Sequence, residues 1–92
     1  MQPEIRVYTT KICPYCFTAK RLLDRNALKY VEISVEDPAR RAELVKNSGK
    51  KTVPQIYIGD LHVGGSDELH ALERSGKLYE LTGTQPPSVD RA

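Results

Sequence analysis

Strand-type and helix-type patterns alternate along the first third of the sequence, and this order restricts the chain to few folds. Residues 5–8 alternate apolar and polar side chains as half-buried strands do, and residues 29–35 repeat the pattern. Between them Pro14 suits the first position of a helix, where its missing N–H would be unpaired anyway, and a helical pattern continues to about Asn26. A strand, a helix and a strand in succession predict a parallel pair joined by a right-handed crossover. We therefore expect an α/β fold.

The middle of the chain predicts a second helix and a hairpin. Asp37 is a capping residue, Pro38 suits the first helical position, and Gly49 follows the expected last turn at about residue 48. Strands are predicted over residues 55–58 and 61–63, because a Gly-Asp pair between two short apolar runs is a hairpin signal. The hairpin adds antiparallel strands to the parallel pair.

A third helix is predicted after the hairpin. Ser66 or Asp67 is expected to cap it, and Gly76 is expected to end it. Leu78 and Leu81 are expected to dock a last turn. The complete order is β-α-β-α-β-β-α.

The chain has 92 residues, which suits one small domain and is too short for two. We expect this domain to span residues 1–82. Residues 83–92 are rich in proline and polar side chains, which is typical of a frayed tail.

Charge and hydropathy limit the expected binding partners and cellular compartment of the protein. The net charge is only +2, and no stripe of basic and aromatic residues indicates nucleic-acid binding. No stretch approaches the ~20 apolar residues that span a bilayer, and no apolar run of signal-peptide length follows Met1. We therefore expect a cytoplasmic monomer with neither nucleic acid nor membrane as partner.

The two cysteines, Cys13 and Cys16, are placed for chemistry rather than for stability. A disulfide between them closes a very short loop, which stabilises least, and a cytosolic compartment keeps thiols reduced. Cys13 takes the cap position of the first helix, where free N–H groups and the helix dipole favour a thiolate, so its pKa is predicted to lie below the ~8.5 of a free cysteine. Cys16 lies one turn further on the same face and is less solvated. We predict that Cys13 attacks disulfides and that Cys16 resolves the intermediate.

Two alternatives for the cysteine pair involve no exchange reaction. One is a pair of small buried side chains, and the other is half of a zinc site. Zinc needs two further donors, and only His62 and His70 offer nitrogen ligands, neither with a ligand-like partner nearby in the sequence. We expect no metal.

A second signal is Thr52-Val53-Pro54, just before the predicted strand at residues 55–58. A cis bond before Pro54 would turn the Val53 backbone outward and leave its N–H and C=O free to pair with an extended, peptide-like ligand. A plain trans bond at a loop end is the alternative and is the ordinary state of an isolated X-Pro bond. The nearby cysteine pair is what favours the cis bond.

A third signal is Gly64-Gly65-Ser66-Asp67 at the start of the third helix. Glycines let a ligand approach the backbone, the first amides of a helix bind carboxylates, and Asp67 suits an ammonium group. The γ-glutamyl end of glutathione carries both of these groups. An ordinary capped helix is the alternative.

Lysines lie close to the first two signals. Lys11 lies two residues before Cys13, and Lys50 and Lys51 precede Thr52. They are placed to meet the glycyl carboxylate of glutathione and to favour a thiolate at Cys13. The alternative for each is a solvated surface lysine.

The signals together give a family resemblance that covers residues 4–81. With Lys11, Cys13-Pro14-Tyr15-Cys16, Thr52-Val53-Pro54 and Gly64-Gly65-Ser66-Asp67 in this order, the chain resembles a dithiol glutaredoxin of the short bacterial type. The resemblance implies a thioredoxin-like fold, in which a four-stranded mixed sheet has helices on both faces. It also implies a cis peptide bond before Pro54.

The resemblance further implies a set of glutathione-binding residues. They are Lys11, Tyr15, Arg41, Thr52, Val53, Pro54, Gly65, Ser66 and Asp67. Arg41 falls where family members often help to hold the glycyl carboxylate. Many relatives carry a third cysteine where this sequence has Ser66, and its absence removes a regulatory oxidation site without affecting the exchange itself.

The activity implied by this family is glutathione-dependent thiol–disulfide exchange, with glutathione as co-substrate. Cys13 alone serves protein–glutathione mixed disulfides, and Cys13 with Cys16 serves protein disulfides such as that of ribonucleotide reductase. The expected partners are glutathione, glutathionylated proteins and disulfide-containing client proteins. Glutathione reductase and NADPH are expected to act indirectly by regenerating glutathione.

Three other functions remain open at this point. The first is a redoxin driven by thioredoxin reductase, which the basic loops and the third signal disfavour. The second is an iron–sulfur cluster carrier, although iron–sulfur-binding relatives usually have Gly or Ser at the position of Pro14. The third is the zinc-binding module described above.

Overall fold

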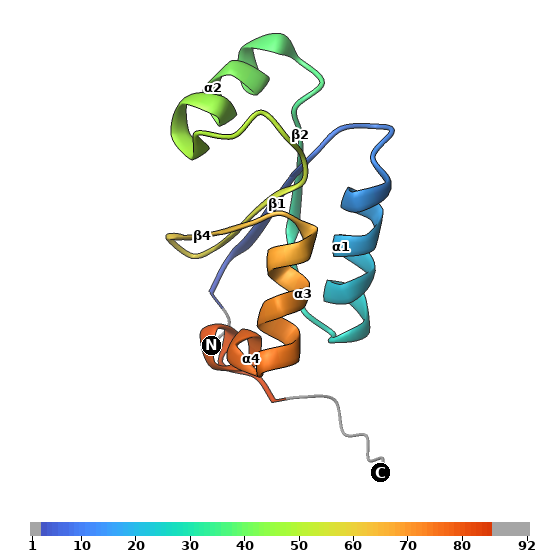
Figure 1. The fold of residues 1–92 in the computed structure, drawn as a ribbon, viewed down its shortest axis with the longest axis vertical. Coiled ribbons are helices and arrows are strands. Elements are labelled where there is room, and N and C mark those ends of the chain that lie inside the picture. The colour runs from blue at the N-terminus through green and yellow to red at the C-terminus, as the bar shows by residue number, and fades with distance from the viewer. Residues whose placement is uncertain (1–2, 86–92) are drawn as a thin grey trace.

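A four-stranded sheet and its helices make up residues 3–85, the part of the chain that the computed structural model describes (Figure 1). The elements are β1 (Ile5–Thr9), α1 (Pro14–Arg25), β2 (Val31–Ser34), α2 (Pro38–Ser48), β3 (Gln55–Ile58), β4 (Leu61–Gly64), α3 (Ser66–Ser75) and α4 (Lys77–Thr82). The strand order is β2-β1-β3-β4, in which β1 and β2 are parallel and the other two pairs are antiparallel. The predicted α/β fold with a four-stranded mixed sheet is confirmed.

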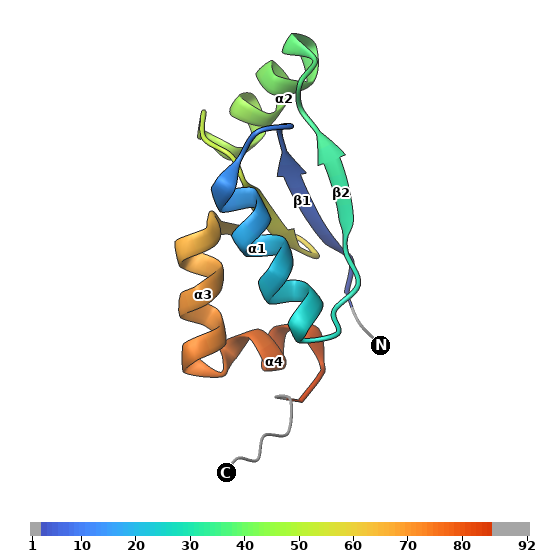
Figure 2. The same ribbon diagram turned by 90° about the vertical axis from the view of Figure 1, so that its right-hand side faces the viewer.

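The helices cover the two faces of the sheet unequally. α1 and α3 lie side by side on one face, whereas α2 lies apart from them (Figures 1 and 2). The main core forms under α1 and α3, where alternate residues of β1 and β3 meet the buried faces of the helices. Its buried members are Ile5, Val7, Ala19, Leu22, Leu23, Leu28, Ile56, Ile58, Leu69 and Leu78. Each large apolar side chain in this core contributes about 1.5–3 kcal/mol relative to leaving it exposed.

The first two helices begin and end where the sequence predicts. Cys13 is the N-cap of α1, and its Sγ accepts a hydrogen bond from the N–H of Cys16. Asp37 caps α2 by accepting a hydrogen bond from the N–H of Ala39, and Gly49 ends that helix with a φ of +74°. Because Cys13 is fixed by the end of β1 and the start of α1, the fold presents its sulfur at the tip of a helix.

The cap of the third helix differs from the prediction. Gly65, rather than Ser66 or Asp67, is the N-cap of α3. A glycine has no side chain with which to cap a helix, and the Glu68 carboxylate instead accepts a hydrogen bond from the Gly65 N–H at 2.8 Å. The expected last turn is a further helix, α4, which begins after Gly76 and buries Leu78.

β2 is shorter than the predicted strand and lies at an edge of the sheet. Its apolar side chains are only partly covered, since Val31 is 48% exposed and Ile33 is half-buried. Lys20 of α1 pairs with Glu32 at 3.0 Å, and such charges on an edge strand discourage pairing with another chain.

The predicted tail, residues 83–92, lies mostly outside the described residues. Its first part is bonded to α4, because the Thr84 N–H donates to the Tyr79 carbonyl and the hydroxyls of Thr82 and Thr84 lie 2.7 Å apart. Within residues 3–85, no helix combines the length and apolar character needed to cross a membrane.

A polar network joins α1, α3 and α4 at the end of the molecule away from Cys13. Arg25 donates two hydrogen bonds to the Glu73 carboxylate, the shorter at 2.6 Å, and Asn26 donates a third at 2.8 Å. The Tyr79 hydroxyl donates to the Asn26 side chain at 2.9 Å. Burial raises the pKa of Glu73, but the hydrogen bonds from Arg25 and Asn26 outweigh it and leave this pKa below its ordinary value.

We expect Glu73→Ala to lower the free energy of unfolding at neutral pH by about 1–2 kcal/mol, at the low end for charged hydrogen bonds because Arg25 is largely exposed. A lowered folded pKa means that the stabilisation is present above the unfolded pKa of about 4.3 and is lost as the pH falls through the folded pKa. Urea denaturation should therefore show a clear difference from wild type near pH 7 and a much smaller one at about pH 2.5. Glu43→Ala, which removes an exposed carboxylate of α2 that makes no hydrogen bond or ion pair within residues 3–85, is the control. A difference that persists unchanged in acid would contradict the ionic origin of the effect.

Candidate active site

Cys13 and Cys16 form a disulfide in this structure, with their Cα atoms 5.2 Å apart. Cys16 is buried in the first turn of α1, whereas Cys13 is only partly covered. The predicted division into an outer and an inner cysteine therefore matches their burial. The Cys16 N–H lies 3.1 Å from Cys13 Sγ and points at it, which stabilises negative charge on this sulfur when the disulfide is reduced.

The loop before β3 passes beside Cys13. Val53 and Pro54 are joined by a cis peptide bond, as predicted, and the Val53 carbonyl oxygen lies 3.7 Å from Cys13 Sγ. The Val53 N–H makes no hydrogen bond to any residue of the described chain. This backbone segment therefore offers a free donor next to the reactive sulfur.

A cavity of about 170 Å3 opens between this loop and the start of α3. It is lined by Tyr15, Thr52, Val53, Pro54, Gly65, Ser66, Asp67 and Glu68. Three segments far apart in the sequence supply these residues: the first turn of α1, the loop before β3 and the start of α3. The structure thus brings seven of the nine predicted ligand-binding residues into one place.

The start of α3 gives this cavity an anion-binding end. The N–H groups of Ser66 and Asp67 belong to the first turn of the helix, where N–H groups have no intrahelical partner. The Asp67 carboxylate is exposed and makes no hydrogen bond or ion pair with the rest of residues 3–85. A carboxylate and an ammonium group of one small ligand therefore have separate partners here.

Lys11 and Arg41 lie outside the lining of the cavity. The Lys11 N–H donates to the Glu36 carboxylate, and its side chain is exposed. Arg41 donates to the Lys51 carbonyl at 2.7 Å. Arg41 thereby supports the chain just before Thr52 and is not itself a wall of the cavity.

Glu68 is a cavity residue that the sequence analysis did not select. Its carboxylate holds the Gly65 N–H, and its side chain fills the space beside Gly64, where an added Cβ would lie 3.1 Å from Glu68 Cγ. A glutamate three residues after a helix N-cap is the available signal, because this spacing belongs to the capping box. The prediction missed it by placing the cap at Ser66 or Asp67.

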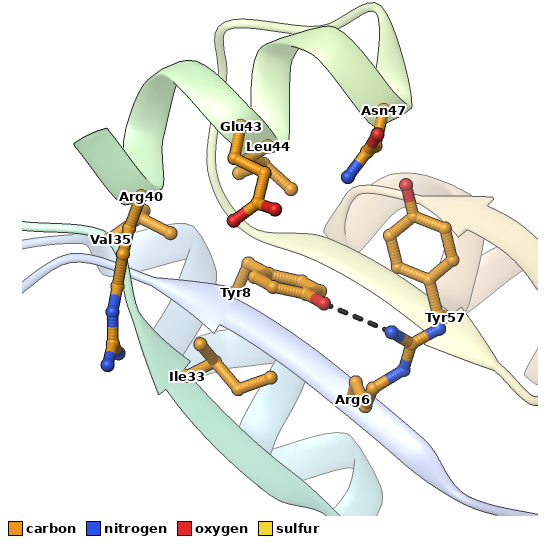
Figure 3. A pocket seen from close by; sticks show the side chains of 9 residues that line it. All are labelled: Arg6, Tyr8, Ile33, Val35, Arg40, Glu43, Leu44, Asn47 and Tyr57. Carbon is orange, nitrogen blue, oxygen red and sulfur yellow. Dashed lines mark hydrogen bonds between the residues drawn. The ribbon is translucent and has the colours of Figure 1, made fainter. Parts of the chain in front are cut away.

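A larger cavity, of about 500 Å3, lies between α2 and the outer face of the sheet (Figure 3). Arg6 and Tyr8 of β1 and Tyr57 of β3 form part of its wall, and it shares no lining residue with the cavity at the start of α3. Its residues were not selected from the sequence. Among residues 3–85, no three His, Cys, Asp or Glu side chains converge as a metal site would require.

Comparison with known proteins agrees with this geometry. The glutaredoxin family model matches residues 5–63. A glutaredoxin of Pseudomonas aeruginosa is 54% identical over 80 residues, which cover 86% of this chain and 95% of the relative. The solution structure of a glutaredoxin from Brucella melitensis superposes with a TM-score of 0.80 at 46% identity, covering 90% of this chain and 91% of that one.

A buckwheat glutaredoxin, solved as a complex with glutathione, superposes with a TM-score of 0.81 at 31% identity, covering 89% of this chain and 77% of that one. The fold, the cysteine pair at the start of α1 and these similarities agree with one another. The chain therefore belongs to the glutaredoxin family of thiol–disulfide oxidoreductases.

Proposed function

We propose that this protein catalyses glutathione-dependent thiol–disulfide exchange, with Cys13 as the nucleophile. The observation that carries the proposal is the cavity lined by Val53, whose carbonyl oxygen lies 3.7 Å from Cys13 Sγ. In this cavity the Val53 backbone can hydrogen-bond to a peptide group of the ligand. The first amides of α3 can bind a carboxylate, and Asp67 can bind an ammonium group. Glutathione has all three features, and the buckwheat relative was solved with glutathione bound.

In the first route, the Cys13 thiolate attacks the glutathione sulfur of a protein–glutathione mixed disulfide. The protein thiolate leaves, takes up a proton, and Cys13 becomes joined to glutathione. A second glutathione thiolate attacks the glutathione sulfur of this intermediate, which releases oxidised glutathione and restores the Cys13 thiolate. The Cys16 N–H directed at Cys13 stabilises the charge each time this sulfur leaves.

In the second route, Cys13 attacks a disulfide of a client protein and forms a mixed disulfide with it. Cys16 lies one turn away, and its thiolate attacks Cys13 Sγ, so that the client leaves as a dithiol. The Cys13–Cys16 disulfide that remains is the state in this structure. Two glutathione molecules reduce it and become one molecule of oxidised glutathione.

Apolar side chains beside Cys13 provide a surface for client proteins. Ile12 is 92% exposed, Tyr15 66% and Phe17 59%, which is unusual for large apolar residues. Lys11 lies two residues before Cys13, and Lys50 and Lys51 directly precede Thr52. All three lysines are exposed and favour an acidic surface on the client protein. Disulfide-containing proteins such as ribonucleotide reductase are proposed as clients on this basis.

The proposal also names the source of electrons, the cellular compartment and the oligomeric state. Glutathione reductase and NADPH return oxidised glutathione to its thiol form, and the reaction runs in the cytoplasm on a monomeric protein. Reduction potentials of glutaredoxins, about −200 to −230 mV, lie close to the cytosolic glutathione potential and allow exchange in both directions.

Coupled assays with each reductase test the proposal. Turnover of a glutathionylated peptide should require glutathione with glutathione reductase and NADPH, and the rate should saturate with glutathione. Turnover with thioredoxin reductase alone, in the absence of glutathione, would identify the protein as the alternative redoxin.

We expect Asp67→Asn to raise the KM for glutathione about two- to fivefold, because an ion pair between an exposed carboxylate and an ammonium group contributes up to about 1 kcal/mol. The kcat should change less than twofold, since Asp67 is remote from the sulfur–sulfur exchange. Steady-state rates across a series of glutathione concentrations measure both constants. Asp60→Asn, an exposed carboxylate in the β3–β4 turn, is the matched control. An equal rise in KM in both variants would remove Asp67 from the binding site.

A further inference from the structure

Gln55 is a buried polar residue directly behind the loop that faces glutathione. Its residue exposure is 2%, and it opens β3 next to Pro54. Its amide Nε2 donates to the Thr52 carbonyl at 2.9 Å and to the Thr52 hydroxyl at 3.2 Å. The side chain thus closes the turn that displays Val53.

The orientation of the Gln55 amide follows from its partners. A carbonyl oxygen only accepts hydrogen bonds, so the NH2 group of Gln55 must face Thr52. The amide oxygen, Oε1, then faces the other way and lies 2.7 Å from Nε2 of His62 in β4. His62 must therefore donate this hydrogen bond, which both its Nε2–H neutral form and its charged form do.

Aromatic side chains on the face of the sheet that α2 covers hold His62 in place. Its ring stacks on Tyr57 with the ring centres 4.7 Å apart and an interplanar angle of 21°. The Tyr57 ring packs edge-on against Tyr8 at 5.7 Å, and the Arg6 guanidinium lies 4.9 Å from its centre. Figure 3 shows Tyr57, Tyr8 and Arg6 on the wall of the cavity under α2. His62 lines neither this cavity nor the one beside Cys13.

We infer that His62 is a positioning residue for glutathione: through Gln55 it holds the Thr52-Val53 backbone in the conformation that the tripeptide meets. The inference rests on the glutathione activity proposed above. Without the His62 N–H, the buried Gln55 oxygen loses its donor, and a buried polar group left unpaired is costly. The Gln55 side-chain amide is then more stable when it rotates toward other hydrogen-bond partners, and this rotation breaks its hydrogen bonds to Thr52. A loop that is no longer held must be ordered when glutathione binds, and this weakens binding.

Kinetics of His62→Phe test the inference, because phenylalanine keeps a ring to stack on Tyr57 and removes the N–H. We expect the KM for glutathione to rise about three- to tenfold, and the kcat to stay within twofold. The rate at which iodoacetamide alkylates Cys13, followed against pH, should stay close to wild type, because the Cys16 N–H that stabilises the Cys13 thiolate belongs to the first turn of α1 and does not depend on His62. His62→Leu is the second variant, should the larger ring disturb the fold.

Two controls separate the hydrogen bond from general packing. His62→Gln carries an amide donor of similar reach, and its KM should return to within twofold of wild type. Tyr57→Phe keeps the stacked ring and removes a hydroxyl that no hydrogen bond within residues 3–85 uses, so its KM should equal that of wild type.

A folded His62→Phe or His62→Leu protein with a wild-type KM would overturn the inference. A His62→Gln KM as high as that of His62→Phe would overturn it as well, because the hydrogen bond would then not be the cause. If the wild-type rate itself shows no saturation with glutathione, the proposed function fails and the positioning role fails with it. The wild-type series therefore distinguishes the two failures.

Discussion

Replacing Cys13 by serine is expected to abolish both exchange reactions, with a loss of at least about a thousandfold in kcat/KM. A serine hydroxyl is not ionised near neutral pH and does not form a bond to sulfur that glutathione can break by exchange. Every step of both proposed routes begins with the sulfur of Cys13 or returns to it. The coupled assay with glutathione reductase measures the loss on a glutathionylated peptide and on a protein disulfide.

The same substitution should leave the fold intact, which makes the result interpretable. Cys13 caps α1 by accepting a hydrogen bond from the Cys16 N–H, and serine is a favoured N-cap residue with an oxygen in the corresponding place. Circular dichroism and urea denaturation should therefore resemble those of the reduced wild-type protein. Residual turnover at more than a few per cent of wild type would assign the attack to Cys16 instead.

Local rules predicted the helix boundaries well, because each depends on a few adjacent residues. Pro14 and Pro38 fix the first turns of α1 and α2, and Gly49 ends α2 in the left-handed conformation that a side chain would disfavour. The third helix shows the limit of such rules. Ser66 and Asp67 are better capping residues than Gly65. The carboxylate of Glu68, however, accepts a hydrogen bond from the free Gly65 N–H, and the cap lies one residue before Ser66 and two before Asp67.

Long-range packing decided the features that local patterns did not reveal. Alternation predicted β2, but the exposure of Val31 follows from its place at the sheet edge, which depends on the order of all four strands. The partners of Gln55 could not be read from the sequence for the same reason. Its bond to His62 exists only because β3 and β4 pair in a particular register.

The candidate site was assembled in part by resemblance rather than by derivation. The residues themselves indicated a reactive Cys13 and a peptide-binding Val53, and the structure brings these two together. Nothing local indicated that Tyr15 and Asp67 line the same cavity, since more than half of the chain separates them. Arg41 was included by the family pattern, and in the structure it supports Lys51 from outside the cavity.

The proposed routes give Cys16 a different task from Cys13, because of where it lies. It is buried in the first turn of α1, with 2% of its surface exposed, so a bulky protein disulfide does not reach it. The partly covered Cys13 sulfur is the atom that it does reach, as the disulfide between them shows. In the proposed mechanism, Cys16 is therefore needed only where an intermediate on Cys13 must be resolved from within the protein.

We expect Cys16→Ser to separate the two routes. Deglutathionylation, in which a second glutathione resolves the intermediate, should remain within about threefold of wild type, whereas reduction of a protein disulfide should fall at least about a hundredfold. The variant should also accumulate a stable mixed disulfide with the client, visible as a covalent adduct by mass spectrometry. Cys16→Ala is the companion variant, because it places no hydroxyl in the buried position and should give the same separation. Equal loss of both reactions in the folded variants would mean that Cys16 takes part in the first attack, and equal retention of both would mean that glutathione resolves client intermediates without it.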